Sequence, residues 1–273
     1  MKQRLGITLL FLLGATLSHA FQNSPTLPTR CHSQTCCAAL TERQMQFWED
    51  VDEGLDGIES FYAKKGQDID RIRTFSKRAR GELPPPEGSG PGHDPSEEHV
   101  DGLTAKPFWD VSEHPELFPW AAELEEKSGI IQKEFEEILL NPSELFKADS
   151  AVSETMGAGW SALRLQRLGK YTENVQKFPE TYQILRKLRI PLAVRGVCFA
   201  RQAPGTGVAP HSDGRNFILT THLGLKVPED CWIKVGEEEQ TWQVGKLTTL
   251  DTSFTHSTGN NSDEDRHVLV GGA

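Results

Sequence analysis

Two histidines, an aspartate and an arginine in the final third of the chain have the types and spacing of a metal site. His211 and Asp213 are two residues apart, so on an extended strand their side chains leave the same face. A second histidine, His256, follows further along. Two imidazoles and one carboxylate on one face of a metal leave the opposite face open, which is the ligand set typical of non-heme Fe(II) oxygenases. We therefore predict that His211, Asp213 and His256 are the metal ligands and the catalytic residues.

Arg266 indicates what the open face would bind. A guanidinium presents a planar fork of donors that suits a carboxylate. In an Fe(II) oxygenase of this kind, that carboxylate would be the distal one of 2-oxoglutarate. Because Arg266 precedes the apolar run Val268–Val270, a predicted strand, we expect it to face the cavity or its rim. A lone His-x-Asp pair is a weak signal, and the alternative is that His211 caps a loop.

Short strands are the elements that would position these residues. From Ile190 onward, apolar runs alternate with turns that contain glycine, proline or asparagine. We place His211 at the start of one strand and His256 at the end of another. Together with the metal residues, this pattern favours a mainly β protein with flanking helices (α+β). Its core would be a double-stranded β-helix, or jelly roll, of the cupin type. The predicted strands cover residues 192–200, 216–225, 231–235, 241–244, 247–250 and 268–270.

Helices are predicted in the preceding part of the chain. Residues 41–80 carry apolar residues at intervals of three and four, which predicts a helical flank, a pair of helices broken near Gly66. Residues 81–101 are rich in proline, glycine and acidic residues and are interpreted as a flexible linker, in which His93 and His99 would be solvated. The enzyme domain would cover residues 102–273. It would begin with a helix that ends at Asn141-Pro142, a strand over 160–168 and a helix over 180–188.

The N-terminal residues are typical of targeting segments. A basic start, a short apolar run and the small residues before Ala20 predict a secretory signal peptide, residues 1–20. Residues 21–40 lack acidic residues and are interpreted as a transit-like leader. We expect a plastid destination in an alga with complex plastids; the alternatives are the ER lumen or secretion. An uncleaved anchor is disfavoured because the apolar run is short, so no membrane span is expected in the mature chain.

Composition excludes some classes of partner and fold. A net charge of −10 provides no basic surface for phosphates, so no nucleic-acid partner is expected. Three of the five cysteines lie in the predicted leader. The other two, Cys198 and Cys231, are interpreted as buried thiols in strands, with a single disulfide as the alternative.

Several ordered motifs carry a family resemblance. From about residue 102 to 270 the chain resembles the aspartyl/asparaginyl β-hydroxylase family of Fe(II)/2-oxoglutarate dioxygenases. The resemblance implies Fe(II), 2-oxoglutarate as co-substrate and O2, with ascorbate as a reductant. The matching segments are Gly102-Leu-Thr-Ala-Lys-Pro-Phe-Trp-Asp110, Gly159-Trp-Ser-Ala-Leu163, Phe178-Pro-Glu-Thr181, Ala203-Pro-Gly-Thr206, Pro210-His211, His222-Leu-Gly-Leu225, Trp242-Gln-Val-Gly-Lys246 and Asp251-Thr-Ser-Phe-Thr-His256.

The resemblance also implies residue roles. His211 and His256 look like the two iron-binding histidines, and Arg266 looks like the arginine that pairs with the distal carboxylate of 2-oxoglutarate. His222 and Trp160 fall on positions that contact the co-substrate. His267 adjoins Arg266 but points the other way on a strand, so it is excluded from the site.

Three positions depart from the pattern of the animal members. Those members have glycine where this chain has Asp213, whereas many bacterial members have the aspartate, and we expect Asp213 to be a third ligand. The alternative is a water-facing acid. Thr220 stands where the animal members have a further co-substrate-binding arginine, and Ala200 stands where they have a serine. Fewer contacts to the co-substrate are therefore expected.

The substrate is left open by the sequence. Relatives modify aspartate or asparagine side chains in proteins, or the acyl chains of lipids, so a protein, lipid or small-molecule substrate is expected. Two other functions compete with the dioxygenase. One is a cupin metalloenzyme that does not use 2-oxoglutarate, and the other is a non-catalytic binding module with the same fold.

Overall fold

The computed structural model describes residues 41–84, 86–94, 99–139, 156–157, 159–167, 169–188 and 196–272. The predicted signal peptide and leader lie outside the described residues and stay predictions. The chain divides into two compact units. One contains the residues up to 87 together with 95–103, and the other contains residues 88–94 together with 104–273. None of the helices in the described ranges is long and apolar enough to cross a bilayer.

The first unit contains a pair of helices, α2 (Glu42–Ala63) and α3 (Asp70–Ala79). Between them Gly66 has a φ of 67°, a left-handed conformation that glycine adopts without strain. Leu55 on α2 packs with Ile72 on α3 in a small apolar cluster. The helical pair broken near Gly66 is therefore present, and its apolar residues face each other.

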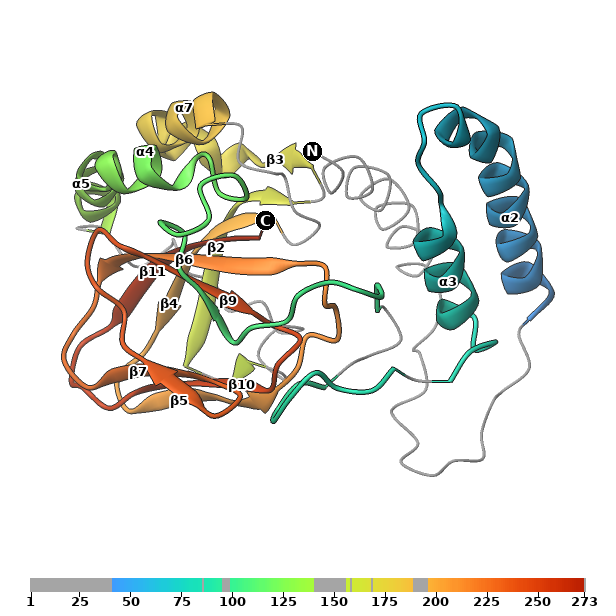
Figure 1. Ribbon diagram of the computed structural model, residues 1–273. Coiled ribbons are helices and arrows are strands. Elements are labelled where there is room, and N and C mark those ends of the chain that lie inside the picture. Colours follow the sequence, from blue (N-terminus) through green and yellow to red (C-terminus); the bar gives the residue numbers. More distant parts are fainter. Residues whose placement is uncertain are drawn as a thin grey trace. The chain divides into compact units, whose positions relative to one another are not determined.

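The second unit is built around two antiparallel sheets, to which β4 to β11 contribute eight strands (Figure 1). Strands β9, β6, β11 and β4 are neighbours in that order in the larger sheet, and β5, β10, β7 and β8 form the smaller sheet. Apart from β7 and β8, which pair with each other in the smaller sheet, consecutive strands from β4 to β11 lie in different sheets. This connectivity is that of a jelly roll and agrees with the predicted fold. The eight strands are β4 (Val197–Gln202), β5 (Thr206–His211), β6 (Leu219–Lys226), β7 (Cys231–Val235), β8 (Glu238–Gln240), β9 (Leu247–Asp251), β10 (His256–Asn260) and β11 (Arg266–Gly272).

Further elements extend and cover the larger sheet. Strand β1 (Phe108–Trp109) pairs with β9, while β2 (Trp160–Arg167) and β3 (Lys170–Tyr171) continue the sheet beyond β4. The outer face of this sheet is covered by helices, as Figure 1 shows, and residues of both layers share one apolar cluster. The helical segments are α4 (Ala121–Glu126), α5 (Ser128–Leu139), η2 (Glu173–Lys177) and α7 (Pro179–Leu188).

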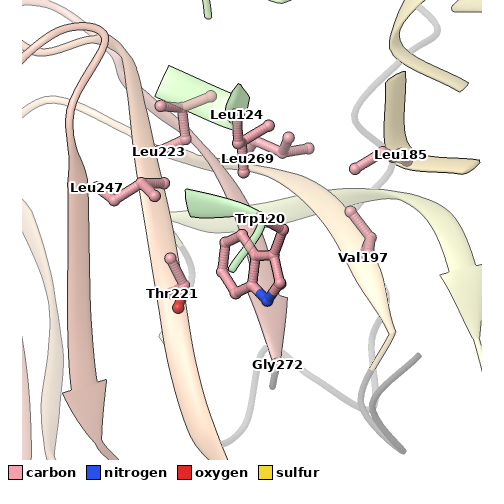
Figure 2. Close-up of a pocket in the computed structure, with 10 residues that line it drawn as sticks. Trp120, Leu124, Leu185, Val197, Thr221, Leu223, Leu247, Leu269 and Gly272 are labelled. Atoms are coloured by element: carbon pink, nitrogen blue, oxygen red, sulfur yellow. The ribbon is translucent and has the colours of Figure 1, made fainter. Parts of the chain in front are cut away.

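Strand alternation separates two apolar layers. In β6, Leu223 and Leu225 belong to the cluster under the helices, so His222 points to the opposite face, between the two sheets. The inner cluster joins Ala200 and Val268 of the larger sheet to β7 of the smaller one. A small apolar pocket, drawn in Figure 2, lies on the helix side of the sheet and is lined by Trp120, Leu124, Leu185, Val197, Thr221, Leu223, Leu247, Leu269, Gly271 and Gly272. This pocket is therefore separated by the sheet from the face that carries His222.

The sequence missed five strands, β1, β3, β5, β8 and β10, and placed one wrongly. Residues 241–243 are not in a strand, and Val244 forms only an isolated bridge with Gly224. Strands β5 and β10 were not predicted because Gly207 and Gly259 were interpreted as turn residues. Gly207 and Gly259 are in fact strand residues. A Cβ at Gly207 would lie 2.5 Å from the Thr258 carbonyl oxygen, and one at Gly259 would lie 2.4 Å from the Trp232 ring.

Candidate metal centre and adjoining carboxylate site

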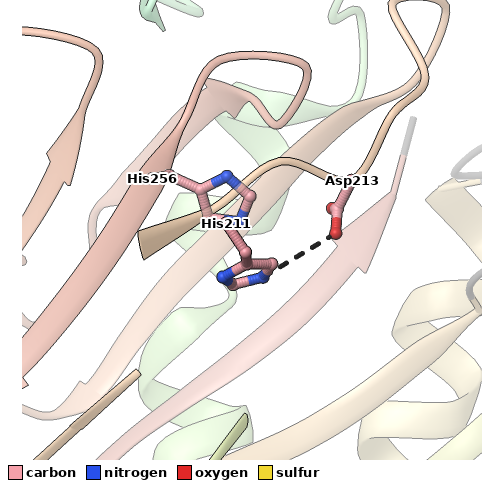
Figure 3. Close-up of side chains that lie close together, drawn as sticks. All are labelled: His211, Asp213 and His256. Carbon is pink, nitrogen blue, oxygen red and sulfur yellow. Dashed lines mark ion pairs between the residues drawn. The ribbon is translucent and has the colours of Figure 1, made fainter. Parts of the chain in front are cut away.

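The three predicted metal ligands come together at one edge of the smaller sheet. His211 is the last residue of β5 and His256 is the first residue of β10, and they are opposite each other in the strand pairing. One ligand atom from each of His211, Asp213 and His256 lies within 4.8 Å of the others. Figure 3 shows the cluster, in which His211 Nε2 lies 3.9 Å from Asp213 Oδ1 and the histidine ring centroids are 4.3 Å apart. The expected convergence of these three side chains is therefore present.

A β-bulge explains how His211 reaches this position. Val208 is buried and pairs with Thr258, yet His211 pairs with His256, so β5 has one more residue than β10 between these two pairs. In a regular strand Val208 and His211, which are three residues apart, would point to opposite faces. The bulge brings them to the same face. The sequence predicted that His211 begins a strand and that His256 ends one. This is wrong, because His211 is the last residue of β5 and His256 is the first residue of β10. Asp213 follows β5 and reaches the cluster through a turn.

Hydrogen bonds determine the tautomer of both histidines. Nδ1 of His211 lies 2.9 Å from the Ala209 carbonyl oxygen, and Nδ1 of His256 lies 2.9 Å from the Phe254 carbonyl oxygen. A carbonyl can only accept, so both Nδ1 atoms carry a proton, and Nε2 is the ring nitrogen of each histidine that would bind a metal. Metal-binding histidines are commonly oriented in this way. Two imidazole nitrogens and a carboxylate oxygen thus form a donor set that fits a divalent transition metal.

Arg266 lies inside the barrel without an acidic partner in the described part of the chain. Its side chain is 2% exposed, one Nη donates to Gln202 Oε1, and the guanidinium lies 4.4 Å from the centroid of the Trp242 ring. Burial lowers the pKa of Arg266 to about 10, so the group still carries its charge at neutral pH. A buried cation among neutral partners is costly unless an anion compensates it. Arg266 is therefore buried, and its surroundings favour a carboxylate ligand. That it faces a cavity stays a prediction.

His222 connects the arginine to the metal cluster. Its Nδ1 accepts a hydrogen bond of 3.1 Å from Trp242 Nε1, so the neutral ring carries its proton on Nε2. Burial, together with the charges of Arg266 and His256, lowers the pKa of His222 to about 3. His222 is therefore a neutral hydrogen-bond donor at physiological pH. It lies close enough to both Arg266 and His256 for their charges to act on it.

The remaining predicted contact residue, Trp160, begins β2 on the inner face. It is opposite Gln202, which is opposite Arg266 on the next strand, and it packs against the inner apolar cluster. Thr220 is 8% exposed, and its Oγ1 has no hydrogen-bond partner among the described residues. Ala200 is buried in the same inner cluster. Both departures from the animal pattern therefore lie inside the barrel.

Two residues of the site were missed by the sequence analysis. Gln202 Oε1 accepts from Arg266 and from Thr258 Oγ1, while its Nε2 donates to the Thr206 carbonyl, so the amide is held in one orientation. Trp242 contacts both Arg266 and His222. No local pattern distinguishes Gln202, but Trp242 stands in one of the segments that carry the family resemblance.

The histidines of the predicted linker are not solvated as expected. His93 is 7% exposed and lies in the same unit as the jelly roll, where it forms a bridge with Phe254. His99 lies in the helical unit with a side chain that is 12% exposed, 3.5 Å from Asp101. Proline and glycine in this stretch predicted an unpacked segment, but neither residue type prevents a chain from burying its side chains.

His267 lies outside the site, as predicted, and gives the protein a pH-dependent stability. It is 3% exposed, its ring is 5.2 Å from that of Phe135, and burial lowers its pKa to about 4 from 6.5. Below pH 6.5 the unfolded chain therefore binds a proton that the folded chain does not. We expect the free energy of unfolding to fall by about 1 kcal/mol per pH unit between pH 6.5 and 4 through this residue.

Urea unfolding of the wild-type chain and of a His267→Leu variant across this range would measure the effect. The variant should lose less stability per pH unit than the wild type, although His222 still contributes in the same direction. Equal slopes for the two proteins would contradict the assignment.

The two described cysteines are free thiols, as the sequence predicted. Cys198 in β4 and Cys231 in β7 are both buried and do not form a disulfide with each other. Burial raises the pKa of Cys198 to about 11, so this thiol stays protonated. Neither residue therefore offers a thiolate to the metal cluster.

Comparison with known proteins finds related sequences. A sequence model of the family described as "Aspartyl/Asparaginyl beta-hydroxylase" matches residues 125–271. The ornithine lipid ester-linked acyl 2-hydroxylase of Rhizobium tropici is 34% identical over 160 residues, which is 56% of this chain and 56% of that protein. The aspartyl/asparaginyl beta-hydroxylase of Homo sapiens is 30% identical over 178 residues, 63% of this chain but 23% of that protein. The chain thus covers about half or less of the length of these relatives.

Solved structures with some likeness include a viral collagen prolyl hydroxylase from Paramecium Bursaria Chlorella virus-1. It is 14% identical, with 41% of this chain and 76% of that chain covered, at a TM-score of 0.28. A likeness at this level supports no conclusion, and the fold assignment rests on the strand order of the two sheets.

Proposed function

Because the chain belongs to the aspartyl/asparaginyl beta-hydroxylase family, we propose that it is an Fe(II)- and 2-oxoglutarate-dependent dioxygenase that hydroxylates its substrate. The observation that carries the proposal is that His222 lies close enough to interact with the charges of both His256 in the metal cluster and the buried guanidinium of Arg266. A small molecule with a metal-binding group at one end and a carboxylate at the other fits these two partners, and 2-oxoglutarate has this form.

The residues of the chain would divide the work as follows. His211 and His256 would bind the metal through Nε2, and Asp213 would provide the third ligand and the negative charge. Arg266 would bind the distal carboxylate with its planar fork, and Gln202 would keep that fork in place. Since all three ligands come from one side, the other side of the metal stays accessible to small molecules.

Ferrous iron, with 2-oxoglutarate and O2, would supply the oxidation that inserts one oxygen atom into a C–H bond of the substrate while 2-oxoglutarate is converted to succinate and CO2. The protein would contribute ligation, orientation and exclusion of water. His222 would donate a hydrogen bond from Nε2 to a carboxylate oxygen of the co-substrate, which its low pKa favours because the ring stays neutral beside Arg266. Trp160 and Trp242 would line the co-substrate cavity with apolar surface.

For the substrate, we propose aspartate or asparagine side chains in proteins, in line with the family's name. The acyl chain of a lipid is the second candidate, because the Rhizobium tropici relative with 34% identity is named a lipid acyl 2-hydroxylase. Both substrates present an unactivated C–H bond near a carbonyl group. The choice between them depends on the part of the site that receives the substrate and not on the metal ligands.

The test is conversion of 2-oxoglutarate by the full chain. The purified protein would be incubated with Fe(II), ascorbate and labelled 2-oxoglutarate, first alone and then with acidic peptides or with ornithine lipid. Labelled CO2 and succinate should appear, and the true substrate should increase their formation and gain the mass of one oxygen atom. Iron binding without any conversion of 2-oxoglutarate would favour a cupin metalloenzyme of another class, and no metal binding would favour a binding module.

A further inference from the structure

The segment 88–94, called the strap below, packs beside the metal cluster although it precedes the family match at residue 125. Thr255 N donates to the Gly92 carbonyl oxygen at 2.6 Å, and Asp94 N donates to the Ser253 carbonyl oxygen at 3.1 Å. His93 and Phe254 form an antiparallel bridge between these two hydrogen bonds. The strap is thus held by one isolated bridge and two backbone hydrogen bonds to residues 253–255, in the connection between β9 and β10.

The side chain of His93 begins a chain of buried hydrogen bonds. Its Nδ1 accepts from Ser89 N at 2.7 Å, so the proton of the neutral ring is on Nε2, which donates to Ser253 Oγ at 3.1 Å. Ser253 Oγ in turn donates to Asp251 Oδ1 at 2.5 Å. Asp251 is 1% exposed, and its carboxylate also accepts from Ser253 N. The His93 ring stacks on Phe254 at 4.7 Å with an interplanar angle of 28°.

The residues that His93 contacts are also those that hold the metal ligands. The carbonyl of Phe254 accepts from His256 Nδ1 and so sets the tautomer and direction of that ring. The carbonyl of Thr252, the residue before Ser253, accepts from Asp213 N at 2.8 Å. The carbonyl of Ser253 accepts from Ser212 Oγ at 3.1 Å. A change in the position of this connection would therefore move His256 and Asp213 together.

We propose that His93 is a positioning residue of the metal centre, which acts through Ser253 and Phe254 on His256 and Asp213. Hydrogen bonds to groups around metal ligands orient those ligands, and their removal typically weakens metal affinity about 10–100-fold. The inference depends on the proposed function only in that His211, Asp213 and His256 bind a metal. It extends the functional unit to a segment on the N-terminal side of the family match.

Two variants at position 93 separate the hydrogen bond from the ring. His93→Phe keeps a ring to stack on Phe254 and loses both hydrogen bonds, whereas His93→Gln keeps an amide donor close to the position of Nε2. The matched control is His114→Phe. His114 packs edge-on against Trp109 at 5.3 Å, and Trp109 is in contact with the apolar cluster under the helices. The measurement is Co(II) binding to the full, metal-free chain, followed by the visible absorption of the bound ion and without 2-oxoglutarate.

We expect His93→Phe to bind Co(II) about tenfold or more weakly and with an altered absorption band. His93→Gln should recover most of the affinity, and His114→Phe should bind like the wild type. Melting temperatures of the metal-free proteins show whether each variant is folded at the titration temperature. Unchanged Co(II) affinity and absorption in folded His93→Phe would overturn the proposal, as would an equal loss in His93→Gln. The Co(II) titration contains no co-substrate. If the wild type binds Co(II) but later fails to turn over 2-oxoglutarate, the result contradicts the proposed function and leaves the role of His93 intact.

Discussion

Replacement of His256 by alanine is expected to abolish both metal binding and 2-oxoglutarate turnover. His256 provides one of two imidazoles in a cluster of three ligands, and its Nε2 has no substitute among the described residues of that cluster. The loss of metal affinity should exceed the roughly 100-fold that loss of an outer-shell partner can cost. Co(II) or Fe(II) titration of the folded variant, together with assay of labelled CO2, would measure both effects.

Asp213→Gly is the informative companion to this variant. It removes the carboxylate but leaves both histidines, the set found in the animal members of the family. If Asp213 is a ligand, affinity should fall by less than in His256→Ala, and the absorption of bound Co(II) should change. A His256→Ala protein that is folded and still binds Co(II) like the wild type would show that the metal lies elsewhere.

Replacement of Arg266 is expected to act on the co-substrate and leave the metal in place. Removing one partner of a buried, hydrogen-bonded charge pair costs about 2–5 kcal/mol, which corresponds to a weakening of roughly 30-fold or more. The KM for 2-oxoglutarate should therefore rise by at least this factor in Arg266→Ala. Arg266→Lys should be intermediate, because an ammonium keeps the charge but lacks the planar fork. Co(II) affinity should be unchanged in both.

Gln202→Glu gives an independent check of the same interaction. The new carboxylate would have nearly the shape of the amide and would lie at the atom that already accepts from Arg266. It would form an internal ion pair and compete with the carboxylate of 2-oxoglutarate, so the KM should rise although Arg266 is intact. Turnover that is indifferent to both Arg266→Ala and Gln202→Glu would support a cupin metalloenzyme that does not use 2-oxoglutarate.

The sequence was sufficient for the fold class and for the grouping of His211, Asp213 and His256, while metal binding by these residues stays a prediction. Apolar runs in β6, β7 and β9 have the length and alternation of strands, and they were predicted with small errors at their ends. The two histidines and the aspartate were predicted from their types, since few residue sets suit an open ferrous site. Their convergence depends on which strands become neighbours, and the family resemblance supplied that information.

The features that the sequence did not predict depend on close contacts between distant segments. Glycine in β5 and β10 is needed where a Cβ would collide with a neighbouring strand or the Trp232 ring, but in a sequence it has the appearance of a turn. The bulge that directs His211 inward has no local signal. Gln202 and His93 are polar residues whose roles come from partners 56 to 64 and 160 residues away in the chain.

The free state of Cys198 and Cys231 has a practical chemical consequence. A ferrous centre must be protected from air oxidation, and strong thiol reductants are a common means of doing so. In many extracellular proteins such reagents would break the covalent crosslinks that hold the fold together. The described jelly roll depends on packing and hydrogen bonds instead, so we expect it to tolerate dithiothreitol at the concentrations used in anaerobic reconstitution.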